Sequence, residues 1–200
     1  MKVGILAVQG AVSEHTQSVK NAMEELNING YVIPVRDSAI LETINGLIIP
    51  GGESSTISRL IDSLNMRGKI LRLAKQGTPI MGTCAGTILL AKGGDMAVER
   101  SRTKLLGLMD MNVSRNAFGR QRESFELSLN IHGIADDFPG VFIRAPAIVE
   151  VRGDCKEIAQ VEGHIVAAKE SNILALTFHP ELTTDTRMHQ HFLKSIENTI

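Results

Sequence analysis

One cysteine in the sequence has surroundings that suit a nucleophile. Cys84 lies at the centre of residues 82–86, Gly-Thr-Cys-Ala-Gly, between an apolar run at 79–83 and a short helical pattern at 87–91. This is the form of a Gly-x-nucleophile-x-Gly elbow, in which a sharp turn lifts the nucleophile above the end of a strand. The glycines permit the turn, and the following helix N-terminus favours a thiolate. The alternative is a buried structural cysteine in a glycine-rich turn, but the strand-turn-helix context favours the nucleophile.

A nucleophilic cysteine needs a base, and the base needs a partner that orients it. His179 and Glu181 follow an apolar run at 173–178. Residues i and i+2 of an extended segment project to the same side, so the Glu181 carboxylate is placed to orient the imidazole. Taken alone, His179 would fit a structural histidine equally well. Because the ends of parallel strands open on one crevice, we predict a Cys84–His179–Glu181 triad.

A third candidate element is Pro-Gly-Gly-Glu-Ser at 50–54, after an apolar run at 47–50. Two successive glycines leave backbone N–H groups beside the crevice. We expect the N–H of Gly52, together with that of Ala85, to bind the oxyanion of a tetrahedral intermediate. Phosphate binding is the rival interpretation, since glycines before a helix also suit anions. It is disfavoured because a Walker lysine is missing and Glu53 would repel phosphate.

The elements that position these residues alternate in type through the first half of the chain. Apolar runs predict strands at 3–8, 31–35, 47–50 and 79–83. Between them, helical spacing of apolar residues predicts a helix that ends near Gly30 and a helix over 57–64, capped by Ser54 or Ser55. A third, short helix is predicted at 87–91. This alternation is typical of a parallel sheet with helices on both faces.

The second half of the chain changes character. Strict alternation over 125–132 predicts a half-buried strand, and further strands are predicted at 141–144, 147–151, 157–161, 165–169 and 173–178. Met188, Phe192 and Ile196 predict a closing amphipathic helix. We therefore expect an α/β fold: one domain over 1–200, three layers, a largely parallel central sheet, helices on both faces and an antiparallel-rich second half.

The composition excludes several classes of protein. The 200 residues are 43% hydrophobic and 22% charged, with a formal net charge of -1, which is ordinary for a globular chain. This balance gives no electrostatic case for nucleic acid or an anionic membrane surface, and aromatic residues at 4% argue against base stacking. The apolar runs are shorter than the roughly 20 residues of a membrane span. We expect a soluble, cytoplasmic protein without nucleic-acid or membrane partners.

The remaining cysteine and histidines predict no metal site. Cys155 lies 71 residues after Cys84, in a polar turn, and is expected to be incidental. On a helix, His189 and His191 point roughly 200° apart and are not expected to share a metal. The other histidines are predicted to be isolated surface or turn residues: His15, His132 and His164.

Taken together, these segments resemble the glutaminase subunits of pyridoxal 5'-phosphate synthases, within the class I glutamine amidotransferases. The resembling segments run in order from Gln9-Gly10 through 46–54, 82–86, 115–121, 142–146 and 178–183. Anthranilate-type members of the class usually carry Leu where this chain has Ala85. The one departure from the pattern is Ser55, where Thr is usual, and this change is conservative.

The resemblance implies hydrolysis of L-glutamine to L-glutamate and ammonia, without a cofactor or metal. The ammonia would pass to a separate synthase subunit in a hetero-oligomeric complex, with pyridoxal 5'-phosphate as the product. The resemblance also implies which residues line the glutamine site: Gly51, Gly52, Glu53, Arg115, Ile143 and Arg144. Three alternatives stay open: a glutaminase of another class I pathway, a cysteine-dependent hydrolase of similar fold, and a catalytically silent partner of a synthase.

Overall fold

The computed structural model describes residues 1–115 and 124–199, so residues 116–121 of one resembling segment lie outside it. The helices are α1 (Val12–Glu25), α2 (Ser54–Ser63), α3 (Arg67–Lys75), α4 (Ala85–Leu90), α5 (Met96–Arg100) and α6 (Arg187–Glu197), with 3₁₀ turns η1 (Ile40–Thr43) and η2 (Pro180–Leu182). The strands are β1 (Lys2–Leu6), β2 (Tyr31–Val35), β3 (Gly46–Ile49), β4 (Ile80–Thr83), β5 (Ala91–Gly94), β6 (Met109–Ser114), β7 (Ser124–Ile131), β8 (Ala135–Ile143), β9 (Ala147–Val151), β10 (Lys156–Val161), β11 (His164–Glu170) and β12 (Ile173–Leu176).

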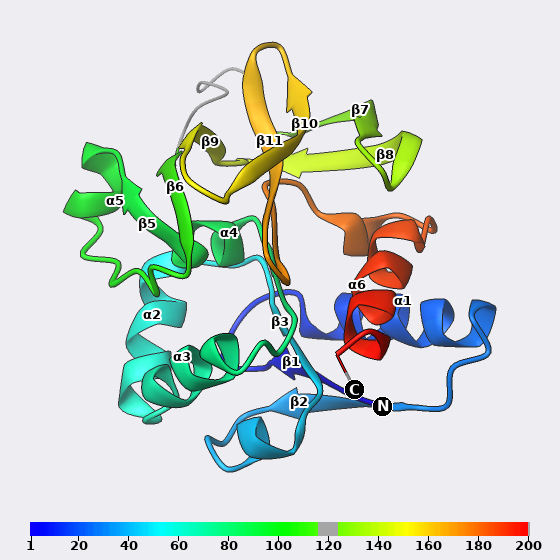
Figure 1. The fold of residues 1–200 in the computed structure, drawn as a ribbon. Coiled ribbons are helices and arrows are strands. Elements are labelled where there is room, and N and C mark those ends of the chain that lie inside the picture. The colour runs from blue at the N-terminus through cyan, green and yellow to red at the C-terminus, as the bar shows by residue number, and fades with distance from the viewer. Residues whose placement is uncertain (116–123, 200) are drawn as a thin grey trace.

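A mixed sheet crosses the molecule, in the order β2-β1-β3-β4-β12-β11-β9-β6-β5, with β10 paired to β11 (Figure 1). The half from β2 to β12 is parallel throughout. From β12 onward, β11, β9 and β6 pair antiparallel with their neighbours, and only β5 and β6 return to parallel pairing. The predicted combination of a parallel sheet with an antiparallel-rich second half is therefore confirmed.

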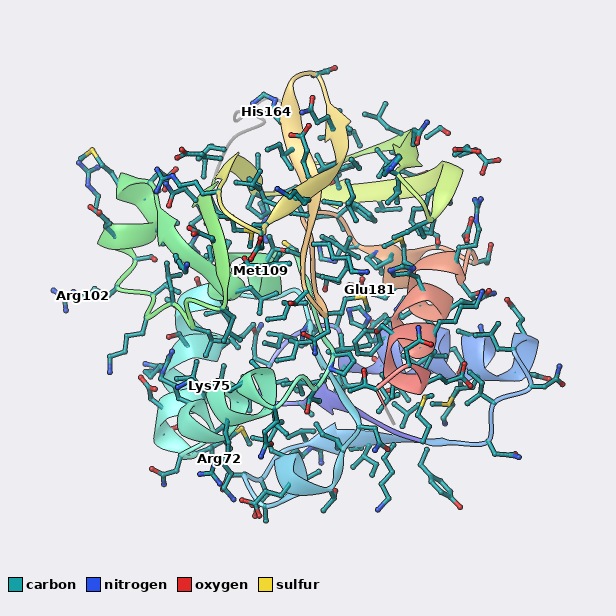
Figure 2. All side chains as sticks on the ribbon, viewed as in Figure 1. Arg72, Lys75, Arg102, Met109, His164 and Glu181 are labelled. Carbon is teal, nitrogen blue, oxygen red and sulfur yellow. The ribbon has the colours of Figure 1, made fainter. Side chains whose placement is uncertain are left out.

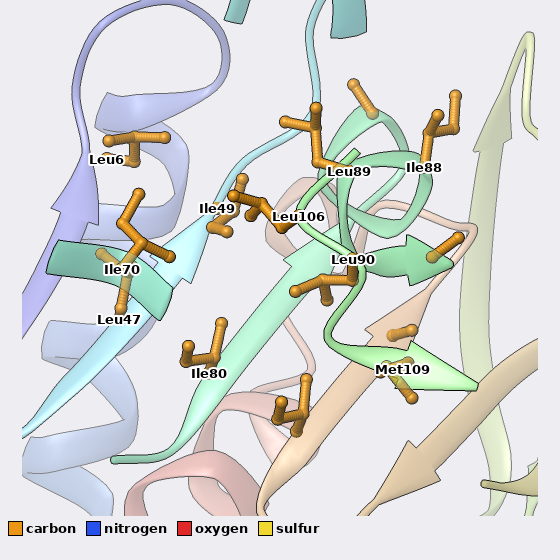
Figure 3. Close-up of a cluster of buried hydrophobic side chains, with 14 of the residues drawn as sticks. Leu6, Leu47, Ile49, Ile70, Ile80, Ile88, Leu89, Leu90, Leu106 and Met109 are labelled. Carbon is orange, nitrogen blue, oxygen red and sulfur yellow. The ribbon is translucent and has the colours of Figure 1, made fainter. Parts of the chain in front are cut away.

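Helices cover both faces of the parallel half. Figure 1 shows α1 and α6 together on one side of the sheet, and α2 and α3 on the other. The central strands explain this arrangement, because their successive side chains enter different clusters. On β3, Leu47 and Ile49 pack into the cluster under α2 and α3, part of which is drawn in Figure 3, whereas Ile48 packs toward α1 and α6. Burial of each such side chain contributes about 1.5–3 kcal/mol to stability, which accounts for the unbroken apolar runs that predicted these strands.

A separate hairpin of β7 and β8 lies beside the main sheet. Its apolar face contains Phe138 and Phe142, whose rings each lie 5.7 Å from the ring of Phe178 just after β12. The backbone N–H of His179 then donates to the carbonyl of Val141 on β8, at 2.8 Å. This packing brings the end of β8 to the carboxyl ends of the parallel strands.

The cap predicted for one helix is wrong, and another helix was missed. Helix α2 is capped by the carboxylate of Glu53, which accepts from the backbone N–H groups of Ser55 and Thr56, so the prediction of Ser54 or Ser55 as the cap is wrong. Glu53 extends one bond further than the usual cap residues and reaches the same two donors. Helix α3 was not predicted at all, although Met66, Ile70 and Leu73 are buried at helical spacing.

Within residues 1–115 and 124–199, no helix is both long enough and apolar enough to cross a bilayer.

Candidate active site

Cys84 lies in a sharp turn between β4 and α4. Its backbone has φ 48° and ψ −104°, a region that residues with a Cβ rarely occupy, and its N–H donates to the carbonyl of Leu176 at 2.8 Å. The flanking glycines make this turn possible. A Cβ on Gly82 would lie 2.8 Å from the carbonyl carbon of Gly86, and a Cβ on Gly86 would collide with the backbone oxygen of Ile49. The strained cysteine is therefore held at the carboxyl edge of the sheet by backbone packing on both sides.

His179 and Glu181 lie beside this turn, after β12 and in η2. The Nδ1 atom of His179 is 2.7 Å from Oε1 of Glu181, and both residues are buried. A Cβ on Gly51 would lie 2.5 Å from Cε1 of His179 and 3.4 Å from Cβ of Cys84, so Gly51 packs against both side chains. Figure 2 shows Glu181 in the interior, on the α6 side of the sheet. The spacing His-x-Glu thus brings the imidazole and carboxylate into direct contact.

The charges at this site favour a protonated imidazole. Burial opposes the charged form of His179, but its hydrogen bonds with the Cys84 sulfur and the Glu181 carboxylate, and their charges, raise the pKa of His179 to about 10. Burial also opposes the Glu181 carboxylate, yet the neighbouring His15 and His179 lower the pKa of Glu181. At neutral pH the imidazole of His179 is therefore protonated, beside the sulfur of Cys84 and held by the Glu181 carboxylate.

The charge of His179 predicts how Cys84 should react with iodoacetamide. The imidazolium lies beside the sulfur and keeps its proton until about pH 10, so the positive charge that favours a reactive sulfur is the same from pH 7 to 9. We expect the alkylation rate of Cys84, followed by peptide mass spectrometry, to be nearly constant from pH 7 to 9. In His179→Asn the rate should climb with pH over this range. A climbing rate in the unmodified protein would contradict a charged His179 beside the sulfur.

Cys155 serves as the internal control. It is 2% exposed, and burial together with Glu170 and Asp110 raises its pKa to about 11. It lies in a turn, as the sequence predicted, but it is buried. Its alkylation should be slow across the same pH range, because little thiolate forms.

A pocket of about 440 Å³ opens over Cys84 and His179. Its wall contains most of the residues predicted for the site: Gly52, Glu53, Cys84, Ala85, Arg115, Ile143, Arg144 and His179. Gly51 lies immediately behind, against His179, and Glu181 lies beneath the imidazole. Four wall residues were not predicted as site residues: Gln9, Ser54, Ile88 and Pro146. Gln9 could have been predicted, because a polar residue that directly follows the first predicted strand lies at the same sheet edge as Cys84.

Opposite charges meet in the pocket wall. The Arg115 guanidinium donates to Oε1 of Glu53 at 2.5 Å. Despite the cost of burial, the hydroxyl of Ser55 and the backbone N–H groups of α2 lower the pKa of Glu53 to about 2, so this carboxylate is ionised at neutral pH. Arg144, which has φ 42°, is a second strained residue of the wall. One anion and two cations beside Cys84 suit an amino acid, whose ammonium and carboxylate need both signs.

The Gly51–Gly52 peptide follows β3, and hydrogen bonds fix Gly51 on two sides. The N–H of Gly51 donates to Oγ1 of Thr83 at 3.0 Å, and its carbonyl accepts from the N–H of Ala11 at 3.3 Å. The N–H of Gly52 points away from that carbonyl because the peptide is trans. Both Gly52 and Ala85 line the pocket, the placement that an oxyanion pair needs.

One histidine, His15, lies elsewhere than predicted. His15 and His189 are fully buried against each other beneath the site, so the expectation that His15 is an isolated surface or turn residue is wrong. The reason is that His15 faces the sheet from α1, four residues before the apolar stripe begins at Val19. His132 is exposed in a turn, as predicted, and Figure 2 shows His164 at the β10–β11 hairpin, far from Glu181.

A parallel sheet with a cysteine elbow and a His-x-Glu pair at its carboxyl edge is the architecture of a class I glutamine amidotransferase. Comparison with known proteins agrees. A solved structure described as a glutamine amidotransferase superposes with a TM-score of 0.86, at 38% identity over 98% of each chain. PurLQS from Thermotoga maritima superposes with a TM-score of 0.62 at 13% identity, a likeness of fold alone.

Sequence comparison identifies the family within this class. The sequence model of the SNO glutamine amidotransferase family matches residues 5–198, and the chain belongs to this family. Among its relatives, pyridoxal 5'-phosphate synthase subunit PdxT of Archaeoglobus fulgidus is 53% identical over 97% of this chain and 98% of that protein. The subunit of the same name from Methanosarcina mazei is 48% identical over 99% of this chain and 100% of its own length.

Proposed function

We propose that this chain is the glutaminase of a pyridoxal 5'-phosphate synthase: it hydrolyses L-glutamine to L-glutamate and ammonia, and the ammonia is used by a synthase subunit. The observation that carries the chemistry is the buried 2.7 Å contact between His179 and Glu181, beside a cysteine held in a strained elbow. The relatives named PdxT support the assignment to this pathway. We further propose that residues 1–200 act as one glutaminase domain and that the protein works in the cytoplasm.

In the first half of the reaction, the Cys84 thiolate attacks the side-chain amide carbon of glutamine. Negative charge develops on the amide oxygen, and the N–H groups of Gly52 and Ala85 stabilise it. The carbon–nitrogen bond then breaks as the His179 imidazolium gives its proton to the leaving nitrogen, which departs as ammonia. The product at this stage is a γ-glutamyl thioester on Cys84.

In the second half, the neutral His179 removes a proton from water, and the resulting hydroxide attacks the thioester carbon. The carbon–sulfur bond breaks, glutamate leaves, and the thiolate and imidazolium are restored. Glu181 keeps the imidazole in one orientation through both halves, because its Oε1 holds Nδ1 and leaves Nε2 for proton transfer. This chemistry uses side chains and backbone alone.

Glutamine recognition falls to the charged wall of the pocket. We propose that the Glu53 carboxylate binds the substrate ammonium, and that Arg115 and Arg144 bind the α-carboxylate. Gly51, Gly52 and Ile143 complete the wall near the reacting amide. In this scheme the present Arg115–Glu53 ion pair rearranges when substrate enters, since each group gains a partner of opposite charge.

Isotope transfer tests this function against its alternatives. The chain is mixed with a pyridoxal 5'-phosphate synthase subunit, a pentose phosphate, a triose phosphate and glutamine carrying ¹⁵N in its side-chain amide. We expect ¹⁵N in the pyridoxal phosphate, and none when Cys84→Ala replaces the normal chain. Ammonia release without transfer would indicate another class I pathway. Absence of ammonia release, with peptides cleaved instead, would indicate a hydrolase of similar fold.

A further inference from the structure

A row of buried polar side chains lies behind the triad, and the mechanism above does not use it. His15 of α1 places its Nε2 atom 3.3 Å from Oε2 of Glu181 and 3.0 Å from Oγ1 of Thr83. Its other ring nitrogen, Nδ1, is 3.1 Å from Nε2 of His189 on α6. Both histidines have no exposed surface. Side chains from α1, β4 and α6 therefore meet behind the Glu181 carboxylate, which orients His179.

The contact with His15 gives the second oxygen of Glu181 a neighbour that can donate. Oε1 is taken by His179, while Oε2 is fully buried and makes no well-directed hydrogen bond among the described residues. The Nε2 atom of His15 lies between this oxygen and the Thr83 hydroxyl. A buried carboxylate oxygen without any donor is destabilised by the loss of its water. An N–H at Nε2 of His15, hydrogen-bonded to Oγ1 of Thr83 and 3.3 Å from Oε2, places positive partial charge beside this oxygen and reduces that penalty.

The histidine pair indicates which nitrogen carries the proton. Burial lowers the pKa of His15, and burial with the neighbouring His15 lowers that of His189 to about 3, so both rings are neutral. If His15 carried its proton on Nδ1, the Nδ1–H of His189 would be a buried donor without a partner in the described structure, and a lone pair would face Glu181.

The opposite tautomer removes both problems. With the proton on Nε2 of His15, the Nε2–H of His189 donates to Nδ1 of His15, and Nδ1 of His189 carries an unpaired acceptor lone pair in place of an unpaired donor. A buried acceptor without a partner is tolerated better than a buried donor. The hydrogen-bond geometry thus favours donation from His189 to His15, with the Nε2–H of His15 on Oγ1 of Thr83 and facing Oε2 of Glu181.

We propose that His15 is a positioning residue of the triad: its Nε2–H, hydrogen-bonded to Oγ1 of Thr83, lies against Oε2 of Glu181 and keeps that oxygen in place, so that Oε1 stays on His179, and His189 fixes the tautomer of His15. Neither histidine lines the substrate pocket, so both act through Glu181. This inference rests on the proposed glutaminase function.

The positioning role predicts an effect on turnover and on its pH dependence. The charged groups that face His15 are Glu181 and His179 from the segment after β12 and Glu14 from its own helix; His189 faces it from α6. An N–H that faces a carboxylate favours its ionised form even when the donor is neutral, so removal of His15 raises the pKa of Glu181. The carboxylate is then protonated at a higher pH as the solution is acidified, so the acid limb of the rate profile moves to higher pH.

Two variants of His15 separate positioning from packing. Gln places an amide N–H near the position of Nε2, whereas Leu has a similar bulk and no donor. In the complex with the synthase subunit, we expect His15→Leu to lower kcat for glutamine hydrolysis by about 10- to 100-fold, with KM changed little, the size of effect seen for groups that orient a site residue from behind it. Its acid limb should move to higher pH, and His15→Gln should recover most of both.

The control is His191→Gln, which changes a partly buried histidine two residues from His189 on the same helix and should leave kcat and the acid limb unchanged. Equal losses in His15→Leu and His15→Gln, accompanied by equal losses in Tm, would show a packing role and overturn the proposal; so would unchanged kcat in both. Should His15→Leu not fold, the same measurements are made on His189→Leu and His189→Gln, which alter the histidine that holds His15. The Gln variant should again recover most of the loss in kcat. Failure of the unmodified complex to release ammonia would instead contradict the proposed function.

Discussion

Replacing Cys84 with alanine should lower glutamine hydrolysis by at least about 10⁴-fold, because the covalent route is lost and only binding and the oxyanion donors remain. Serine at this position should be nearly as inactive, since an alcohol holds almost no alkoxide near neutral pH. The measurement is ammonia release by the complex at saturating glutamine, with the variant and normal chains at equal concentration.

Two controls make this loss interpretable. Cys84→Ala keeps a Cβ in the same strained turn, so its Tm should lie within a few degrees of the unmodified chain. Cys155→Ala should retain close to full activity, because its thiol is buried beside Glu170, away from the pocket. Substantial turnover in Cys84→Ala, or a comparable loss in Cys155→Ala, would show that the nucleophile has been assigned to the wrong residue.

Replacing His179 with asparagine should cost about as much as losing Cys84, on the order of 10⁴-fold, because members of a triad act as a unit. The asparagine amide can still hydrogen-bond Glu181, but it neither protonates the leaving nitrogen nor activates water. It also removes the positive charge beside the sulfur of Cys84. The double variant Cys84→Ala/His179→Asn should be no slower than either single variant.

The activity of the double variant also shows whether Cys84 and His179 act in the same step. If the two losses multiplied in the double variant, Cys84 and His179 would contribute through independent interactions, and a shared proton-transfer step would be excluded. A loss smaller than about tenfold in His179→Asn would also contradict the role of His179 as general acid and base.

The central strands could be predicted from the sequence because each is buried on both faces. Ile48 and its neighbours on β3 enter two different clusters, so the strand appears as an unbroken apolar run. The cysteine elbow and the His-x-Glu pair could also be predicted, because residues so close in sequence have a fixed local geometry. The strand ends were less visible: β8 begins at Ala135 rather than 141, because its first residues alternate in burial on a separate hairpin.

The parts that sequence reasoning missed depend on contacts between distant elements. The spacing of His15 within α1 gives no sign that it meets Thr83, Glu181 and His189, which lie up to 174 residues away. Likewise, the capping of α2 by Glu53 was hidden because glutamate is not among the usual cap residues. Helix α3 did carry a periodic signal, but basic residues dominate its first and last turns.

The most direct test of the account is to catch the acyl-enzyme. The complex is mixed with glutamine, quenched in acid during turnover, and digested for peptide mass spectrometry. We expect a glutamyl adduct on the peptide that contains Cys84, absent from Cys84→Ala and from samples without glutamine. Ammonia release with no adduct on any cysteine under conditions that preserve thioesters, or an adduct on Cys155, would contradict a Cys84 thioester mechanism.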